Sequence, residues 1–346
     1  MNGKAIKPEK FNYRDYLVFV GLTLAIFLVC VAVGSVNVPI GRTAEVLVNA
    51  LKGLPQPDGT TAPIIISSRL PRVICVALVG ASLSTGGAAM QGLLKNPLAD
   101  GTTLGVSSGA SLGAILAIFL GISIPGVPLA GAMVMAMLFA FLSLIIILTL
   151  AYRLDYSLST NTIILLGIIY SMFMSSVIAL LTTFAGERVH NIVFWLMGSL
   201  AGSTYMTAAV LAVVSLVFGG IILCNARELN AFAIGEDNAR HIGVDVRRVR
   251  LIVLIAVSAL IGVCVSAGGV IGFVGLVTPH MVRMITGPNH RRLLPGTIFG
   301  GASFLMLADL LARTILSPRE LPIGVVTSLI GAVLFLVIFF RMRKGR

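Results

Sequence analysis

Long apolar runs recur along the chain, and they constrain its fold more than any other feature. A helix needs about 20 apolar residues to cross the hydrocarbon layer of a bilayer. The mean hydropathy of +1.03 over 346 residues is far above that of water-soluble proteins. The sequence therefore predicts an all-α, polytopic membrane protein with about ten transmembrane helices, near 16–36, 70–93, 100–121, 127–151, 160–184, 204–225, 249–270, 272–286, 295–316 and 323–341.

These runs define one expected transmembrane domain, 16–341, between short tails at 1–15 and 342–346. The first run is too long for a signal-peptide core, so we expect it to be retained as a span. The run 272–286 is short for a full crossing, and its proline predicts a kink or a half-helix. Residues 188–200 predict a further short amphipathic helix at a membrane surface.

Basic residues are unevenly divided between the two sides of the predicted bundle. Ten crossings place both termini on one side, together with 18 of the 25 Lys and Arg residues, so that side is predicted to be cytoplasmic. The net charge of +12 is then explained by an anionic lipid bilayer, and no nucleic-acid partner is expected. The seven basic residues on the other side are Arg42, Lys52, Arg69, Arg72, Arg188, Arg313 and Arg319.

Several kinds of chemistry are not expected of this chain. It has no GxxxxGK[ST] sequence and hence no P-loop of its own for ATP. The four cysteines lack CxxC spacing, and His280 has no carboxylate or cysteine at ligand spacing, so no metal and no cofactor is expected. No Ser/His/Asp set or HExxH motif lies within the spans, so no catalytic residue is predicted.

A long polar segment, 226–250, interrupts the apolar pattern with ten titratable residues. We expect two short helices over 228–234 and 236–242, each ending at a glycine that can adopt the left-handed cap conformation. Ala239 and Ile242 are three apart and would share a small apolar face that a partner could grip. A solvated loop that follows the positive-inside rule is the other interpretation, and spacing alone leaves both open.

Two patterns within the spans predict packing. Gly105, Gly109 and Gly113 are each four apart, the small-xxx-small pattern that lets helices approach closely. Packing inside the chain is the favoured use, although a dimer seam also fits. Asp309 and Arg313 are four apart and are expected to pair, which makes Asp309 a positioning partner rather than a proton relay.

Residues 69–113 (RLPRVICVALVGASLSTGGAAMQGLLKNPLADGTTLGVSSGASLG) resemble the signature of FecCD-type permeases. These are the membrane subunits of ABC importers for iron–siderophore complexes, haem and cobalamin. The resemblance continues through 235–243, 268–295 and 308–333, and so covers most of the chain from Arg69 onward. It implies the type II ABC importer permease architecture in a bacterial inner or plasma membrane. It also implies a cytoplasmic ATPase, an extracytoplasmic substrate-binding protein and a second permease copy or paralogue as partners.

The resemblance also implies roles for individual residues. The segment expected to dock in a groove of the ATPase would use Glu228, Glu236, Ala239, Arg240, Ile242 and Gly243. On the outer face, acidic residues of the binding protein would meet Arg69, Arg72 and Arg313, unless these arginines contact lipid headgroups instead. The translocation path, where two copies meet, would be lined or closed by Asn96, Pro97, Ser157, Ser159 and Thr160.

The function implied is ATP-driven import of an iron–siderophore complex, or else of haem or cobalamin, with ATP hydrolysed by the partner. The alternative is an ion-coupled secondary transporter, which needs a carboxylate or an unwound helix near the midplane. Asp309 is the one plausible carboxylate inside a predicted span, and its neighbouring cation disfavours that alternative.

Overall fold

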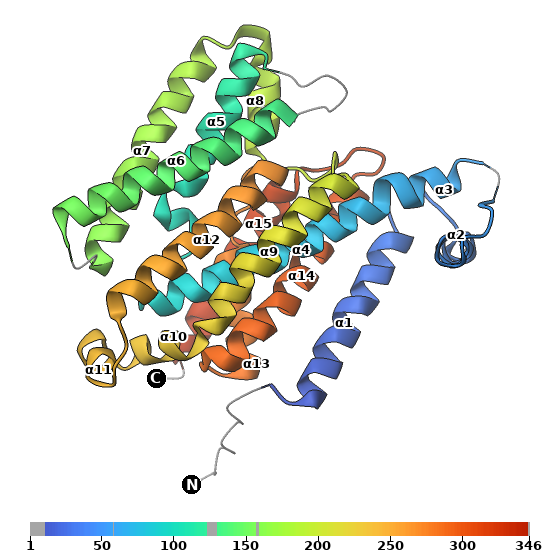
Figure 1. The fold of residues 1–346 in the computed structure, drawn as a ribbon. Coiled ribbons are helices and arrows are strands. Elements are labelled where there is room, and N and C mark those ends of the chain that lie inside the picture. Colours follow the sequence, from blue (N-terminus) through green and yellow to red (C-terminus); the bar gives the residue numbers. More distant parts are fainter. Residues whose placement is uncertain (1–10, 58, 123–129, 157–158, 345–346) are drawn as a thin grey trace.

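The computed structural model describes residues 11–57, 59–122, 130–156 and 159–344, and this part of the chain is helical without strands (Figure 1). Each of the ten predicted runs contains a helix. They are α1 (Tyr13–Ala32), α4 (Leu70–Leu93), α5 (Val106–Leu120), α6 (Ala130–Leu154), α7 (Thr160–Thr183), α9 (Tyr205–Cys224), α12 (Val246–Gly268), α13 (Val274–Thr286), α14 (His290–Thr314) and α15 (Ile323–Lys344).

Seven of these helices in the described ranges are long and apolar enough to cross a membrane. α5 (15 residues) and the apolar stretch Ile323–Ile338 of α15 are shorter, and α13 has 13 residues. At 1.5 Å per residue α13 spans about 20 Å, less than the hydrocarbon layer of about 30 Å. The expected half-crossing is therefore confirmed, with Pro279 inside the helix.

Shorter helices connect the long ones. They are α2 (Ile40–Lys52), α3 (Thr61–Pro63), the π-helix η1 (Ile64–Arg69), the 3-10 helices η2 (Gly101–Leu104) and η3 (Gly186–Arg188), α8 (Val189–Leu196), α10 (Ala226–Ala233) and α11 (Glu236–His241). The predicted helix within 188–200 is confirmed as α8. The amphipathic α2 and the extension of the second span back to Thr61 were not predicted, because their mixed polarity gives a weak apolar signal.

α4 and α12 form the centre of the bundle. In α12, and in the continuous helix 61–93 that includes α4, 72% of the most apolar 18-residue stretch is buried. The corresponding share is 11% in α1 and 17% in α7, whose apolar side chains face outward. α12 packs against both α4 and α6, so it joins two parts of the bundle.

Small residues allow α4 to touch its neighbours backbone to backbone. A Cβ added to Gly80 would lie 2.3 Å from the carbonyl oxygen of Gly301 in α14. A Cβ on Gly87 would lie 1.9 Å from the carbonyl oxygen of Gly275 in α13. Neither position has room for a larger side chain, so α4, α13 and α14 form one closely packed unit.

The glycines of the third span allow close packing against another helix of the same chain, α6. A Cβ on Gly109 would meet Ser143 at 1.7 Å, and one on Gly113 would lie 2.3 Å from the carbonyl oxygen of Met135, both on α6. Gly105 precedes α5 with a φ of 76°, in the left-handed region that favours glycine. Helices α5 to α8 thus form a second group, at the upper left of Figure 1.

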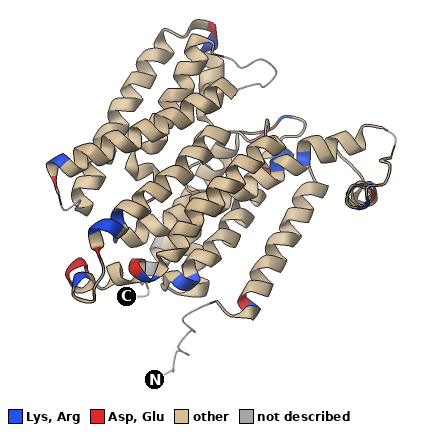
Figure 2. Cartoon of the chain, in the orientation of Figure 1, with Lys and Arg blue, Asp and Glu red and all other residues tan. Residues whose placement is uncertain are grey.

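One end of the bundle gathers the start of α1, the end of α15, α10 and α11 (Figure 1). Figure 2 shows Lys and Arg near the helix ends, including a group around α10, α11 and the start of α12. This arrangement fits an even number of crossings. The assignment of this end to the cytoplasm remains a prediction from the basic residues.

Candidate functional site

The polar segment 226–250 folds as α10, α11 and the first turn of α12, which confirms the two predicted short helices. Gly235 separates α10 from α11 with a φ of 113°, and Gly243 follows α11 with a φ of 89°. Glycine suits both positions because other residues are strained at positive φ. We refer to residues 226–250, which are expected to dock in an ATPase, as the coupling segment below.

Glu236 stabilises the conformation of the coupling segment through an internal ion pair. Its carboxylate forms an ion pair with Arg250, whose side chain is fully buried in α12. The Arg250 guanidinium also lies 5.9 Å from the ring centroid of Phe232 in α10. These contacts fix α11 against the two helices that flank it.

Ala239 and Ile242 do not share an exposed face, so that expectation is wrong for Ala239. Ala239 is fully buried in the core of the chain, whereas Ile242 is 63% exposed. The exposed apolar surface of the segment is formed instead by Ile242 and Ile234, the latter 57% exposed. Arg240 lies on the surface nearby and approaches Asp237 at 3.7 Å.

The remaining candidates of the coupling segment differ in exposure. Gly243 is exposed directly after α11. Glu228 is partly buried, and one of its carboxylate oxygens has no hydrogen-bond partner among the described residues. The structure therefore leaves Ile242, Arg240 and Gly243 accessible, while Glu236 and Ala239 are used inside the chain.

The loop after α4, which carries the candidate path residues Asn96 and Pro97, is held by α13. The carbonyl oxygen of Pro97 lies 2.9 Å from Nε2 of His280, and Arg283 donates to Gln91 of α4 at 3.0 Å. Asn96 accepts a hydrogen bond from the backbone N–H of Leu98 at 2.9 Å. His280 thus has a structural partner, and no group of three or more His, Cys, Asp or Glu among the described residues could hold a metal ion.

The loop before α7, which carries the other candidate path residues, is organised by Asp155. This carboxylate accepts hydrogen bonds from the backbone N–H of Ser159 at 3.0 Å and from the hydroxyl of Thr162 at 3.1 Å. Ser159 is the N-cap of α7, and Thr160 is its first residue. Ser157 lies outside the described residues.

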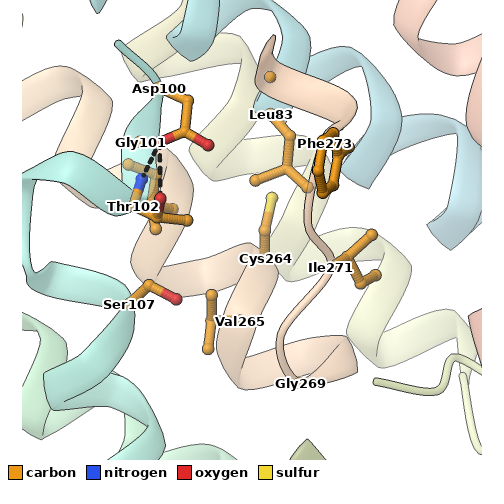
Figure 3. Close-up of a pocket in the computed structure, with 12 residues that line it drawn as sticks. Leu83, Asp100, Gly101, Thr102, Ser107, Cys264, Val265, Gly269, Ile271 and Phe273 are labelled. Carbon is orange, nitrogen blue, oxygen red and sulfur yellow. Dashed lines mark hydrogen bonds between the residues drawn. The ribbon is translucent and has the colours of Figure 1, made fainter. Parts of the chain in front are cut away.

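A small pocket lies where α4, η2 and α12 meet, lined by Asp100, Cys264 and Phe273 among others (Figure 3). Asp100 accepts hydrogen bonds from the backbone N–H groups of Thr102 and Thr103, at 2.9 and 3.3 Å. The carboxylate therefore caps η2 and has a local structural role.

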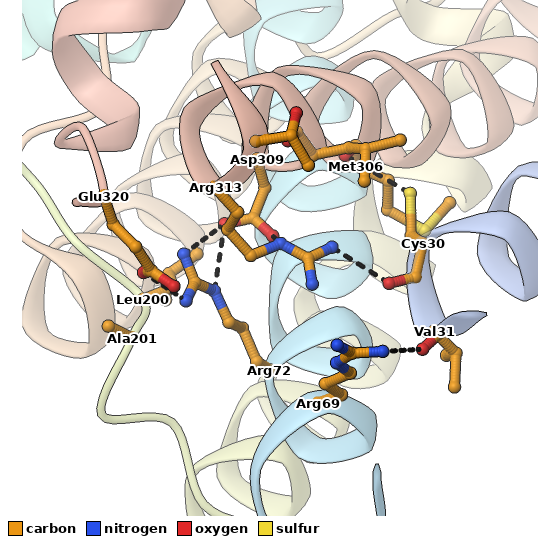
Figure 4. A network of polar contacts seen from close by, with 12 residues as sticks. Cys30, Val31, Arg69, Arg72, Leu200, Ala201, Met306, Asp309, Arg313 and Glu320 are labelled. Atoms are coloured by element: carbon orange, nitrogen blue, oxygen red, sulfur yellow. Dashed lines mark hydrogen bonds and ion pairs between the residues drawn. The ribbon is translucent and has the colours of Figure 1, made fainter. Parts of the chain in front are cut away.

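The opposite end of the bundle holds a buried cluster of charges (Figure 4). Arg72 donates from Nε and Nη2 to Asp309, at 3.0 and 2.9 Å, and from Nη1 to Glu320 at 2.7 Å. Arg313 pairs with the other oxygen of Asp309 at 2.9 Å, which confirms the predicted pairing within α14. Two donors of Arg72 converge on one oxygen of Asp309 while Arg313 faces the other, and this shared carboxylate locks α4 to α14.

Arg69 lies beside this cluster but binds carbonyl oxygens instead of carboxylates. It donates to Ala32 at 2.8 Å and also to Val31 and Val36. Arg69, Arg72 and Arg313 are 5%, 8% and 2% exposed, so none of them extends to lipid headgroups or into solvent. Three arginines and two carboxylates give the cluster a net charge of 3 − 2 = +1. Spacing could not reveal Arg72 or Glu320 as partners because they come from other elements.

Comparisons with known proteins agree with this architecture. Residues 22–341 match the sequence profile of the FecCD transport family. The uncharacterized ABC transporter permease protein YvrB of Bacillus subtilis strain 168 is 41% identical, covering 98% of this chain and 97% of its own. The hemin transport system permease protein HmuU of Yersinia pestis is 38% identical, with 93% and 96% covered.

A solved structure also matches nearly the whole chain. It is described as an inward-facing conformation of a metal-chelate type ABC transporter. The TM-score is 0.83 at 32% sequence identity, and the match covers 95% of this chain and 100% of the other.

Asp309 is predicted to contribute strongly to the stability of the folded protein. Asp309→Asn removes the carboxylate shared by two buried arginines, and breaking such a pair typically costs about 3–5 kcal/mol. We expect a marked fall in the unfolding temperature of the detergent-solubilised protein. Asp237→Asn is the control, since that side chain is 89% exposed and should change little. Equal unfolding temperatures for the two variants would contradict the structural role of Asp309.

Glu320 predicts a pH dependence of stability. Burial alone raises the pKa of this carboxyl, but the hydrogen bond and charge of Arg72 outweigh it and hold the pKa below its ordinary value of 4.5. A depressed pKa in the folded state stabilises the protein above about pH 4.5, and this contribution is lost as pH falls through the folded pKa. Wild type should therefore unfold at a higher temperature than Glu320→Gln at pH 7, and the difference should narrow as the pH is lowered below about 4.5. A difference that does not change with pH would show that Glu320 acts by other means.

Proposed function

The chain belongs to the FecCD transport family, and we propose from this that it is the permease subunit of an ABC importer for a metal chelate, with an iron–siderophore complex as the favoured solute. The observation that carries the proposal is the match of 95% of the chain to a metal-chelate type ABC transporter. A relative named for hemin supports the same class, because haem is an iron chelate. The iron travels inside its chelate, so the permease needs no metal ligands of its own.

A second copy of the chain, or a paralogue, completes the path in this proposal. α7 exposes large apolar side chains along its length, and part of this face would pack against the second permease through van der Waals contact. They include Leu165, Ile169, Met172 and Phe173, each more than half exposed. The loops that carry Asn96, Pro97, Ser159 and Thr160 then close the path at one end.

ATP hydrolysis belongs to a partner subunit, and the chain itself performs no bond chemistry. The coupling segment is proposed to face the cytoplasm and to dock in the ATPase through Ile242, Ile234, Arg240 and Gly243. ATP binding would draw two ATPases together and shift the coupling segments with them. The helices would tilt, the outer cavity would accept the chelate, and hydrolysis would reset the state. Both termini would be cytoplasmic and the protein would lie in the bacterial cell membrane.

Docking of a substrate-binding protein is proposed at the cluster of Arg69, Arg72 and Arg313. Its net positive charge supports attraction of an acidic surface, although the side chains are buried and contact would be long-range or need local opening. Glu320 occupies one donor of Arg72, so it would compete with a partner carboxylate. A binding protein whose attachment is insensitive to salt would contradict this assignment.

Transport in proteoliposomes tests the function directly. The permease reconstituted with its ATPase and binding protein should accumulate a ferric siderophore only when ATP is present. Hemin and cobalamin are measured in parallel to define the solute. Uptake driven by an ion gradient without the ATPase would instead favour the secondary transporter.

Ile242 is predicted to be required for ATPase binding. Ile242→Asp places a charge on the exposed apolar surface of the coupling segment and should reduce co-purification of the ATPase at least tenfold, about 1.4 kcal/mol. Leu54→Asp is the control. Leu54 is an exposed apolar residue like Ile242, at 50%, but it lies between α2 and α3, at the other end of the bundle. If both variants retain the ATPase, the segment does not bind it.

A further inference from the structure

Two contacts fasten the coupling segment to different parts of the bundle. The first is on α10, where Asn230 accepts a hydrogen bond from the backbone N–H of His290 at 2.8 Å. The Asn230 side chain also donates to Asn289, the N-cap of α14, at 2.8 Å. This contact attaches α10 to the closely packed unit of α4, α13 and α14.

The second contact is at the start of α12, where Arg247 lies over two aromatic rings. Its guanidinium carbon is 3.9 Å from the ring centroid of Tyr156 and 4.9 Å from that of Tyr152. The two rings also touch each other, with centroids 5.0 Å apart. Cation–π contacts are favoured at this range, and the buried Nε of Arg247 has no hydrogen-bond partner among the described residues.

The two tyrosines belong to the group of α5 to α8. Tyr152 is in the last turn of α6, and Tyr156 follows Asp155, whose carboxylate organises the first turn of α7. Arg247 is therefore connected through Tyr156 and Asp155 to the N-terminus of α7. Between the two anchors, Asn230 and Arg247, lie α11 and the exposed Ile234 and Ile242.

We infer that Arg247 is the positioning residue that passes movement of the coupling segment to α7. Asn230 anchors the other end of the segment to the α4, α13 and α14 unit, so a force on α11 acts between the two parts of the bundle. This inference rests on the proposed function and names the contact by which the coupling would reach the path. Glu236 of the same segment pairs instead with Arg250 at its end, and so braces the segment internally.

The test follows the N-terminus of α7 in the complete complex. Asn161, exposed in the first turn of α7, is replaced by cysteine in a Cys224→Ser background, where Cys30, Cys75 and Cys264 are buried. The complex with the ATPase is placed in phosphatidylcholine/phosphatidylglycerol nanodiscs. The rate of maleimide labelling at position 161 is measured without nucleotide and with ATP and vanadate.

The labelling rate should differ about fivefold or more between the two states when Arg247 is present. Arg247→Gln, and the double variant Tyr152→Ala with Tyr156→Ala, should abolish this difference while the ATPase still co-purifies and hydrolyses ATP. Arg153→Gln is the matched control, because it loses the same charge one residue from Tyr152 and should keep the full difference.

Any of three outcomes would overturn the inference. A nucleotide-dependent change that persists in Arg247→Gln overturns the inference but leaves the importer intact. A loss that also occurs in Arg153→Gln overturns it as well, because charge near α6 would then be the cause. If the unmodified permease neither binds an ATPase nor responds to ATP, the proposed function fails and this inference falls with it.

Discussion

Close contact between α4 and α14 is the constraint on which the rest of the structure depends. Gly80 and Gly301 let the two backbones meet in the middle of the membrane region. At one end the same pair of helices is joined by Arg72 and Asp309. At the other, Gly92 of α4 leaves space for the ring of His290, since a Cβ there would lie 2.3 Å from its Nε2. Close backbone packing and an ion pair therefore hold the same two helices, α4 and α14, together along their length.

The buried charge cluster is tolerated because its ion pairs and hydrogen bonds offset the free-energy cost of removing the charges from water. A lone arginine or aspartate in this position would be costly, but here one carboxylate serves two guanidinium groups. Backbone carbonyls of α1 satisfy Arg69 and a further donor of Arg313. The cluster thereby attaches α1 to the α4 and α14 pair, and it retains a positive charge near the face proposed for docking.

The remaining helices form two packed groups that α12 connects. α12 contacts both the α4 unit and the α5 to α8 group, and the coupling segment leads directly into it. Asn230 and Arg247 attach the two ends of that segment to different parts. An importer needs such a connection, since energy is released in a separate ATPase and used within the membrane.

The amino-acid sequence by itself determined the helical class, the ten apolar runs, the two short helices of 226–250 and the pairing of Asp309 with Arg313. These depend on local composition and on spacing along a single helix. Tertiary structure decided what Ala239, Arg69 and Arg72 face, because the direction of a side chain depends on which neighbour its helix packs against. It also decided that Glu320 joins the buried charges and that Arg247 reaches Tyr156. Such contacts join distant parts of the chain, and no local pattern encodes them.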